Sequence, residues 1–173
     1  MSPGMSPPHR RQFIGFIACL ALAGAVVLAD QLSKQAASAG LAGRPPVDVL
    51  PFLRLVLVFN KGAAFGFLHD AGGWQHYFLS GLGSVISLLL VLWLWRSHHR
   101  NALLSWGLTL VLGGALGNLI DRVSHQHVID FILLHHGSWQ FPAFNLADGA
   151  ISLGALALML DALGWRIGPA GRD

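Results

Sequence analysis

The sequence predicts an all-α membrane protein: a four-transmembrane-helix bundle with a small extracytoplasmic β-sheet between helices 1 and 2. Composition is the first observation behind this prediction, because 54% of the 173 residues are hydrophobic and only 11% are charged, whereas soluble domains carry about 25% charged residues. The second is the presence of uncharged spans at 12–29, 71–95 and 101–120, each close to the roughly 20 residues that cross the hydrocarbon core. The third is a run at 146–165 that is apolar apart from one Asp near each end.

The elements follow one another along a single membrane domain, residues 12–165. Residues 1–11 are rich in Pro, Ser and Arg and are predicted to form a disordered cytoplasmic N-terminus. Residues 166–173 are predicted to form a cytoplasmic tail, and the segment 31–70 is predicted to lie outside the membrane. The expected helices cover about residues 12–30, 71–95, 101–121 and 146–165.

Within this outer segment the sequence predicts a short β-sheet. The pair Pro45–Pro46 breaks the chain. Residues Phe52–Phe59 (FLRLVLVF) then have the β-branched and aromatic richness of a strand. The stretch Asn60–Gly66 follows as a turn or loop. Because the strand is almost continuously hydrophobic, we expect it to lie on the membrane surface or against the helices.

The distribution of Arg and Lys predicts the orientation of the chain, since cytoplasmic segments of membrane proteins carry an excess of these residues. Segments 1–11, 96–100 and 166–173 total 24 residues and hold six Arg. Segments 31–70 and 121–145 total 65 residues and hold five Arg or Lys. We therefore expect both termini in the cytoplasm and the two longer segments at the outer, periplasmic face.

Several other classes of site are excluded. The net charge of +3 comes from basic residues that are scattered and flank apolar runs, so membrane topology explains it better than nucleic-acid binding does. The single Cys19 excludes an intramolecular disulfide and a cysteine-based metal site, and we expect it to be a small buried hydrophobe. The nine histidines have no carboxylate or Cys at ligand spacing, so no metal site is predicted.

Four aspartates mark the outer ends of the predicted spans: Asp30, Asp121, Asp130 and Asp148. Asp148 would lie only about 3 Å inside a helix that begins near Leu146, whereas the bilayer midplane is about 15 Å deep. The acids therefore line one boundary of the membrane. This placement disfavours a small proton-coupled transporter, whose binding sites belong near the midplane.

Carboxylates gathered at this boundary can do chemistry, because two of them in a poorly solvated site share a proton. One can then act as base on a water molecule while the other donates a hydrogen bond to a scissile carbonyl. Asn118 and Asn145 are available to orient such a pair. Asn118, Asp121 and Arg122 share one helix face at i, i+3 and i+4, and we expect a structural ion-pair and cap role for Asp121.

From spacing alone, an alternative remains open. The polar residues could be the structural cluster of a non-catalytic membrane binder or chaperone, which would bind a lipidated peptide without cutting it.

Five motifs occur in order along residues 13–165. Because of these motifs and the four predicted spans, the chain resembles bacterial lipoprotein signal peptidase, also called signal peptidase II. The motifs are Asp30-Gln31-Leu32-Ser33-Lys34, Asn60-Lys61-Gly62-Ala63-Ala64-Phe65, Gly113-Gly114-Ala115-Leu116-Gly117-Asn118-Leu119-Ile120-Asp121-Arg122, Val128-Ile129-Asp130-Phe131 and Phe144-Asn145-Leu146-Ala147-Asp148.

This resemblance implies a membrane aspartic endopeptidase that removes signal peptides from prolipoproteins by cutting just before the cysteine that carries diacylglycerol. The family's catalytic aspartates correspond to Asp130 and Asp148 in this sequence. Its substrate-binding and dyad-supporting residues correspond to Asp30, Lys34, Asn60, Gly62, Asn118, Arg122 and Asn145.

The resemblance also implies the protein's surroundings. Its partners would be diacylglyceryl-modified prolipoproteins and membrane lipids, with no nucleic acid and no metal or organic cofactor, and we expect a monomer. Its place would be the bacterial cytoplasmic (inner) membrane, with the active site at the periplasmic face. Residues 31–70 would supply a small periplasmic sheet that cradles the lipidated substrate.

One position departs from the family's pattern. The family usually has a glycine two residues before the valine that corresponds to Val128, and here that position is Gln126. If the glycine serves a turn with positive φ, the backbone that leads to Asp130 is expected to differ in this chain.

Overall fold

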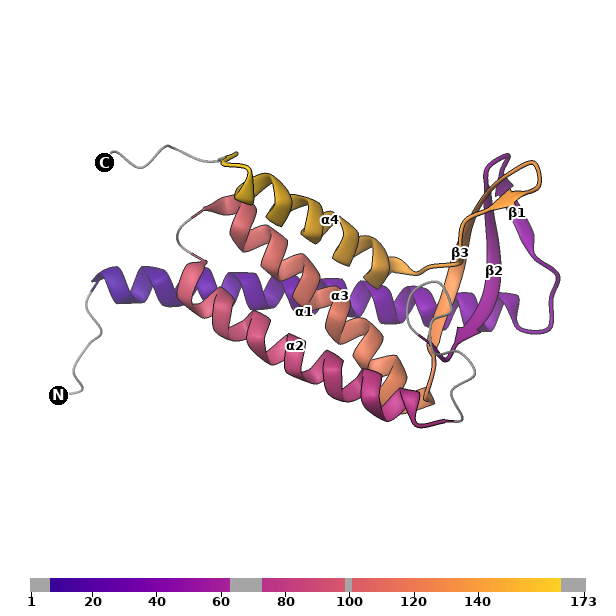
Figure 1. The fold of residues 1–173 in the computed structure, drawn as a ribbon, viewed down its shortest axis with the longest axis horizontal. Helices are drawn as coiled ribbons and strands as arrows, with labels where there is room; N and C mark the ends of the chain where they lie inside the picture. The colour runs from indigo at the N-terminus through magenta and orange to yellow at the C-terminus, as the bar shows by residue number, and fades with distance from the viewer. Residues whose placement is uncertain (1–6, 63–72, 99–100, 166–173) are drawn as a thin grey trace.

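The structure is a computed structural model that describes residues 7–62, 73–98 and 101–165. These residues form four helices and one small antiparallel sheet (Figure 1). The sheet lies at one end of the helix bundle, and the N-terminal end of α1 and the C-terminal end of α4 lie at the opposite end. The elements are α1 Pro7–Leu41, β1 Val47–Leu50, β2 Leu53–Asn60, α2 Gln75–Ser97, α3 Ala102–His125, β3 Val128–His136, β4 Trp139–Gln140 and α4 Leu146–Ala162.

Helix α3 is the centre of the bundle, because it packs against α1, α2 and α4. Its buried leucines Leu104, Leu108 and Leu112 form a core cluster with Leu90 and Leu94 of α2 and with one alanine of α1. The outward faces of the other helices are rich in exposed large hydrophobic side chains. A surface this apolar is unusual for a protein in water and suits hydrocarbon.

Glycines let α3 approach its neighbours closely. A β-carbon on Gly113 would lie 2.8 Å from the β-carbon of Val26 in α1. A β-carbon on Gly114 would lie 2.4 Å from the carbonyl oxygen of Ala147, at the start of α4. Both contacts leave no room for a larger residue.

Three helices are long and apolar enough to cross a membrane by length and composition: Gln12–Leu41, Gln75–Ser97 and Ala102–His125. Helix α4 has 17 residues, which gives a length of about 25 Å, shorter than the hydrocarbon core of about 30 Å. Membrane spans are therefore found for three of the four helices in the described part of the chain. The fourth crossing stays a prediction.

Helix α1 is longer at both ends than the predicted 12–30. It begins at Pro7, which the first turn of a helix tolerates, so residues 7–11 are helical where disorder was predicted. The rest of the predicted disordered segment, 1–6, lies outside the described residues. At the other end the helix continues to Leu41 instead of ending at 30, and Lys34 in this extension is only 1% exposed and pairs with other charged residues. The chain turns shortly afterwards at Gly43, with φ of +68°.

The other helix boundaries differ from the prediction by a few residues. Helix α2 begins at Gln75 instead of 71 and ends at Ser97, and helix α4 ends at Ala162 instead of 165. Helix α3 runs one turn past 121, to His125. It ends at Gln126, whose φ of 64° and ψ of 13° lie in the left-handed region. The turn that suits glycine is therefore present in this chain, and glutamine adopts it.

The sheet has the strand order β1-β2-β3-β4, and all its pairs are antiparallel. The predicted strand over 52–59 is present as β2. The prediction that the sheet lies between helices 1 and 2 was wrong for half of its strands, because β3 and β4 come from the segment between α3 and α4. Strand β3 belongs to the same sheet because it pairs with β2. The register of this pair places Val58 opposite Asp130 and Asn60 opposite Val128.

Candidate active site

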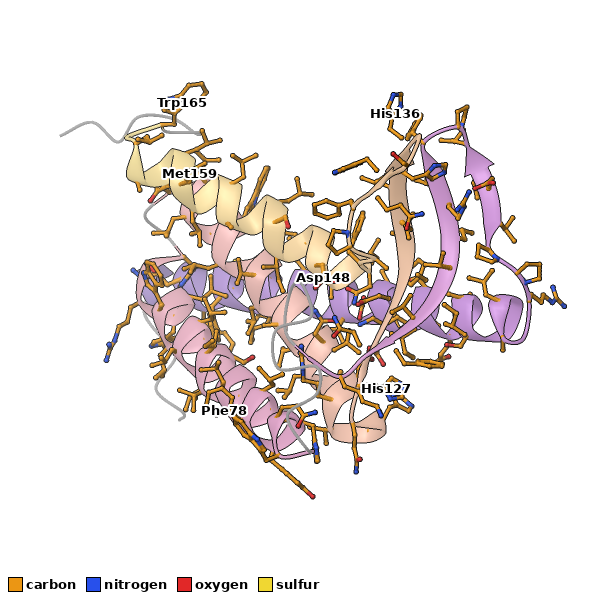
Figure 2. The ribbon with its side chains drawn as sticks, turned by 45° about the vertical axis from the view of Figure 1, so that its right-hand side comes forward. Phe78, His127, His136, Asp148, Met159 and Trp165 are labelled. Atoms are coloured by element: carbon orange, nitrogen blue, oxygen red, sulfur yellow. The ribbon has the colours of Figure 1, made fainter. Side chains whose placement is uncertain are left out.

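A cavity of about 790 Å³ lies between the sheet, the end of α3 and the first turns of α4. Its walls are mostly apolar, and its polar side chains include two carboxylates, Asp130 and Asp148. Figure 2 shows Asp148 at the end of α4 that faces the sheet. The described residues that line the cavity are Val58, Phe59, Asn60, Asn118, Arg122, Val128, Asp130, Leu134, Phe141, Pro142, Ala143, Phe144, Asp148, Gly149, Ile151, Ser152 and Leu153.

Asp130 enters the cavity from the buried start of β3 and is only 2% exposed. Its Oδ1 accepts a hydrogen bond from Asn145 Nδ2 at 2.7 Å, and its Oδ2 accepts one from Asn60 Nδ2 at 3.1 Å. Burial, and secondly the nearby charge of Asp148, raise the pKa of Asp130 to about 6, although both amide donors oppose this rise. Asp130 therefore holds a proton far more readily than an ordinary aspartate.

Asp148 lies in the first turn of α4 and is half-buried. Asn145 and Asp148 form a capping box: Asn145 Oδ1 accepts from the Asp148 N–H at 2.9 Å, and Asp148 Oδ2 accepts from the Asn145 N–H at 3.2 Å. Asn118 Nδ2 donates to the other carboxylate oxygen at 2.8 Å. Two hydrogen-bond donors and the N-terminus of α4 therefore surround this carboxylate.

Asn145 connects the two carboxylates. Its side chain is fully buried, and its Nδ2 lies within hydrogen-bond distance of Asp130 Oδ1, of Asn118 Oδ1 at 3.1 Å and of the Ile129 carbonyl at 3.3 Å. Its backbone and Oδ1 contact Asp148 as described above. One residue therefore fixes the positions of both acids relative to each other.

A buried ion cluster of Asp30, Lys34 and Asp121 lies behind this dyad. Lys34 Nζ is 2.7 Å from Asp30 Oδ2, 2.9 Å from Asp121 Oδ2 and 2.9 Å from Asn118 Oδ1. Each of the three charged side chains is at most 1% exposed. Because Lys34 occupies Asn118 Oδ1, the amide NH₂ of Asn118 is left to face Asp148.

The ion cluster also holds backbone segments in place. Asp30 Oδ1 accepts from the N–H of Ala147 at the start of α4, at 2.9 Å. Asp121 Oδ2 accepts from the N–H of Ile129, next to Asp130, at 3.1 Å, and Gln31 Nε2 donates to Asp121 Oδ1 at 2.8 Å. The positions of both dyad residues are thus tied to α1 and α3.

The candidate residues from the sequence fall into two groups. Asp130, Asp148, Asn60, Asn118 and Arg122 line the cavity. The remaining candidates contact these residues from outside the cavity. Asn145 binds both acids, and Asp30 and Lys34 belong to the ion cluster. The N–H of Gly62 donates to Asn60 Oδ1 at 3.0 Å, and the carbonyl of Gly62 lies 3.4 Å from Arg122 Nη2. The part of the second motif at 63–65 lies outside the described residues.

Sequence reasoning missed three kinds of site residue. Gln31 bonds Asp121 in the ion cluster, and its place next to Asp30 was the one available signal. Phe141 and Phe144 form part of the cavity wall with their ring centroids 6.0 Å apart, and they directly precede the start of α4. Gly149 also lines the cavity. The contact between Gln31 and Asp121 joins residues 90 positions apart, so spacing along the chain gives no indication of it.

Comparisons with known proteins identify the family of the chain. The family profile described as Signal peptidase (SPase) II matches residues 22–164. The lipoprotein signal peptidase of Acinetobacter baylyi is 46% identical over 154 residues, which cover 89% of this chain and 83% of that protein. The lipoprotein signal peptidase of Burkholderia vietnamiensis is 50% identical over 138 residues, with 80% and 82% covered.

Two solved structures, both described as bacterial membrane enzymes determined by the in meso method, have similar folds. The structure at 2.3 Å resolution has a TM-score of 0.76 and 27% identity, and the match covers 90% of this chain and 93% of that one. The structure at 1.9 Å resolution has a TM-score of 0.73 and 29% identity, with 84% and 92% covered.

Proposed function

Because the chain belongs to the signal peptidase II family, aspartic proteases that remove signal peptides from prolipoproteins, we propose that Asp130 and Asp148 are its catalytic pair. The bond cut is the one just before the cysteine that carries diacylglycerol. The single observation that carries this proposal is that both carboxylates line one cavity while Asn145 binds each of them.

The two acids have different surroundings, which support different roles. Asp148 is half-buried at the cavity wall and has the N-terminus of α4 and the amide of Asn118 as donors, so we assign it the role of the base that activates water. Asp130 is buried, and its pKa, raised to about 6, makes it easier to protonate than an ordinary aspartate, so we assign it the shared proton. A bound substrate would exclude more water from the cavity and favour that proton further.

The reaction then follows the general aspartic-protease scheme. Asp148 takes a proton from a water molecule, whose oxygen attacks the carbonyl carbon of the scissile peptide bond, while Asp130 gives its proton to the carbonyl oxygen. In the second step the C–N bond breaks. The new amine takes the proton held by Asp148, and Asp130 recovers its proton as the carboxylic acid product forms. All protons are accounted for, and the dyad returns to its starting state.

The cavity suits a lipidated substrate. Apolar side chains such as Leu134, Phe141, Ile151 and Leu153 form its walls, and burying acyl chains against such walls is favourable. A lipoprotein precursor is held in the membrane by its signal peptide, so the reacting bond must be met at the membrane boundary. We therefore place the dyad at the outer face of the inner membrane, with both termini in the cytoplasm and α4 as the fourth crossing.

The test is cleavage by the purified protein in detergent of a diacylglyceryl-modified prolipoprotein beside its unlipidated twin. We expect product from the lipidated substrate alone, and none when Asp130 is replaced by Asn. Cleavage of both substrates would keep the protease and remove the lipid requirement. Binding of the lipidated substrate without any cleavage would favour the non-catalytic binder instead.

A further inference from the structure

Gly149, the residue that follows Asp148 in α4, has no structural reason to be a glycine. The glycines that lie opposite in α3 are required by packing: a β-carbon on Gly114 would be 2.4 Å from the Ala147 carbonyl oxygen, and one on Gly117 would be 2.6 Å from Asp30 Oδ2. A β-carbon on Gly149 would meet nothing within 4 Å. Its φ is also not among the positive ones, so other residues fit the backbone there.

Glycine at this helical position is a local disadvantage, because it is the poorest helix former apart from proline. The space it leaves is inside the cavity, since Gly149 is one of the residues that line it. Ser152 and Leu153, at i+3 and i+4, line the cavity from the same face of α4. The hydroxyl of Ser152 donates back to the Asp148 carbonyl at 2.8 Å. The missing side chain therefore widens the cavity directly beside the proposed base.

The substrate of the proposed reaction has one bulky group next to its scissile bond. Its cysteine sulfur carries a branched glyceryl group with two acyl chains, and this branch starts next to the scissile bond. From there the chains must reach the apolar walls at Phe141, Phe144 and Leu153. On the other side of the scissile bond, the last residue of the signal peptide has an ordinary side chain. That side chain needs less room than the branched glyceryl group on the cysteine sulfur.

We propose that the space left by Gly149 is the subsite for the sulfur-linked glyceryl neck of the substrate's cysteine, so that this residue determines acceptance of the lipid. The proposal rests on the function proposed above. It assigns to Gly149 a specificity role without a part in the chemistry.

The test uses the two halves of the cleaved substrate as competitive inhibitors of the purified enzyme. One is a short peptide that begins with S-dipalmitoylglyceryl-cysteine, and the other is the released signal peptide. In Gly149→Leu the inhibition constant of the lipopeptide should rise by about 10-fold or more, since overfilling a packed site commonly costs this much. The constant of the signal peptide should stay within about twofold, and KM for the whole precursor should rise with the lipopeptide constant.

Gly24→Leu is the matched control. Gly24 is a helical glycine of α1 whose β-carbon would also meet nothing within 4 Å, and it does not belong to the cavity lining described above. We expect its kinetics to match those of the unchanged protein. Gly149→Ala tests the same point with a smaller side chain that favours the helix, and it keeps the test possible if Gly149→Leu does not fold. In Gly149→Ala the inhibition constant of the lipopeptide should rise by about threefold.

The outcomes separate the two proposals. If the unchanged protein does not cleave the lipidated precursor, the proposed function fails. If it does cleave, and the lipopeptide inhibits Gly149→Leu as well as before, the subsite is not at Gly149. A rise confined to the signal-peptide half would also overturn the inference, because the space would then belong to the residue before the scissile bond.

Discussion

Asn145 and Asp148 bind each other twice at the start of α4, through hydrogen bonds of 2.9 and 3.2 Å that join the side chain of each to the backbone N–H of the other. The proposed base is therefore also the residue that stabilises the first turn of its own helix. Function and local stability can be separated because an amide oxygen can accept the same hydrogen bond as a carboxylate oxygen.

Replacing Asp148 by Asn should remove turnover and leave the helix start intact. The amide can still accept from the Asn145 N–H, but it cannot take a proton from water, so kcat should fall by about 100-fold to 10,000-fold. Asp148→Ala should lose the same activity and in addition about 1 kcal/mol of stability, because the half of the capping box in which Asp148 Oδ2 accepts from the Asn145 N–H is lost. Cleavage assays and thermal unfolding of both variants in detergent measure the two effects. Equal unfolding temperatures for the two variants would contradict the capping role.

Asp130 should make the folded protein less stable as the pH rises. Its pKa is raised from 3.8 to about 6 in the folded state, so the stability that its protonated form contributes is complete below the unfolded value and is lost as the pH rises through the folded value. Asp130→Asn does not titrate. Between about pH 4 and pH 7 the unfolding free energy of the variant relative to the unchanged protein should therefore increase by up to about 3 kcal/mol.

Unfolding by denaturant in detergent at both pH values measures this difference. The control is Asp48→Asn on β1, because the hydrogen bond from Arg54 lowers the pKa of Asp48 and gives the opposite sign. Its contribution is present above the unfolded pKa of 3.8 and is lost as the pH falls below that value. The difference between Asp48→Asn and the unchanged protein should therefore hardly change between about pH 4 and pH 7. Parallel pH dependence of Asp130→Asn and the unchanged protein would show that Asp130 ionises freely in the folded state.

Lys34→Met should be strongly destabilising. The change leaves Asp30 and Asp121, both at most 1% exposed, without their cation, and breaking a buried ion pair from one side costs about 3 to 5 kcal/mol. Asp30→Asn together with Lys34→Met removes both partners of the pair, and the new amide can still accept from the Ala147 N–H. We expect this double variant to be more stable than Lys34→Met alone. Arg54→Met at the solvent-exposed pair with Asp48 is the control and should change the unfolding temperature little.

Gln126→Gly should stabilise the protein. Gln126 is the one non-glycine residue with positive φ in the described part of the chain, and a side chain in this conformation costs roughly 1 kcal/mol that glycine does not. The greater freedom of glycine in the unfolded chain offsets part of the gain, so we expect an increase of about 0.5 kcal/mol. Gln126→Ala keeps the β-carbon and should give no gain. An equal gain from both variants would show that the glutamine side chain, and not its backbone, causes the strain.

Local patterns in the sequence predicted the parts of the fold that depend on neighbouring residues. The β-branched run at 52–59 became β2, and the start of α4 at Leu146 follows from the cap residue before it. The shared face of Asn118 and Arg122 follows from helical spacing, and both line the cavity. In each case the cause lies within a few residues along the chain.

The parts that could not be predicted depend on contacts between distant segments. The first helix was expected to end at 30, but it continues past Lys34, whose charge is neutralised in part by Asp121, 87 positions later. Residues Val128–His136 were expected in the connecting segment before the last helix, and they form a strand by pairing with β2, which lies far away along the chain. Gln126 keeps a glycine turn because helix and strand on either side fix its backbone.

The order of the site residues along the chain has a consequence for biosynthesis. The carboxylate of Asp30, in the first helix, binds the backbone of Ala147, in the last, and Asp130 reaches the cavity on a strand that pairs with β2 from before α2. The segment that contains Asn145 and Asp148 leaves the ribosome after every other part of the site. Until that segment is inserted, the nascent chain has only one acid of the proposed pair, so under the proposed mechanism it cannot cleave a peptide bond.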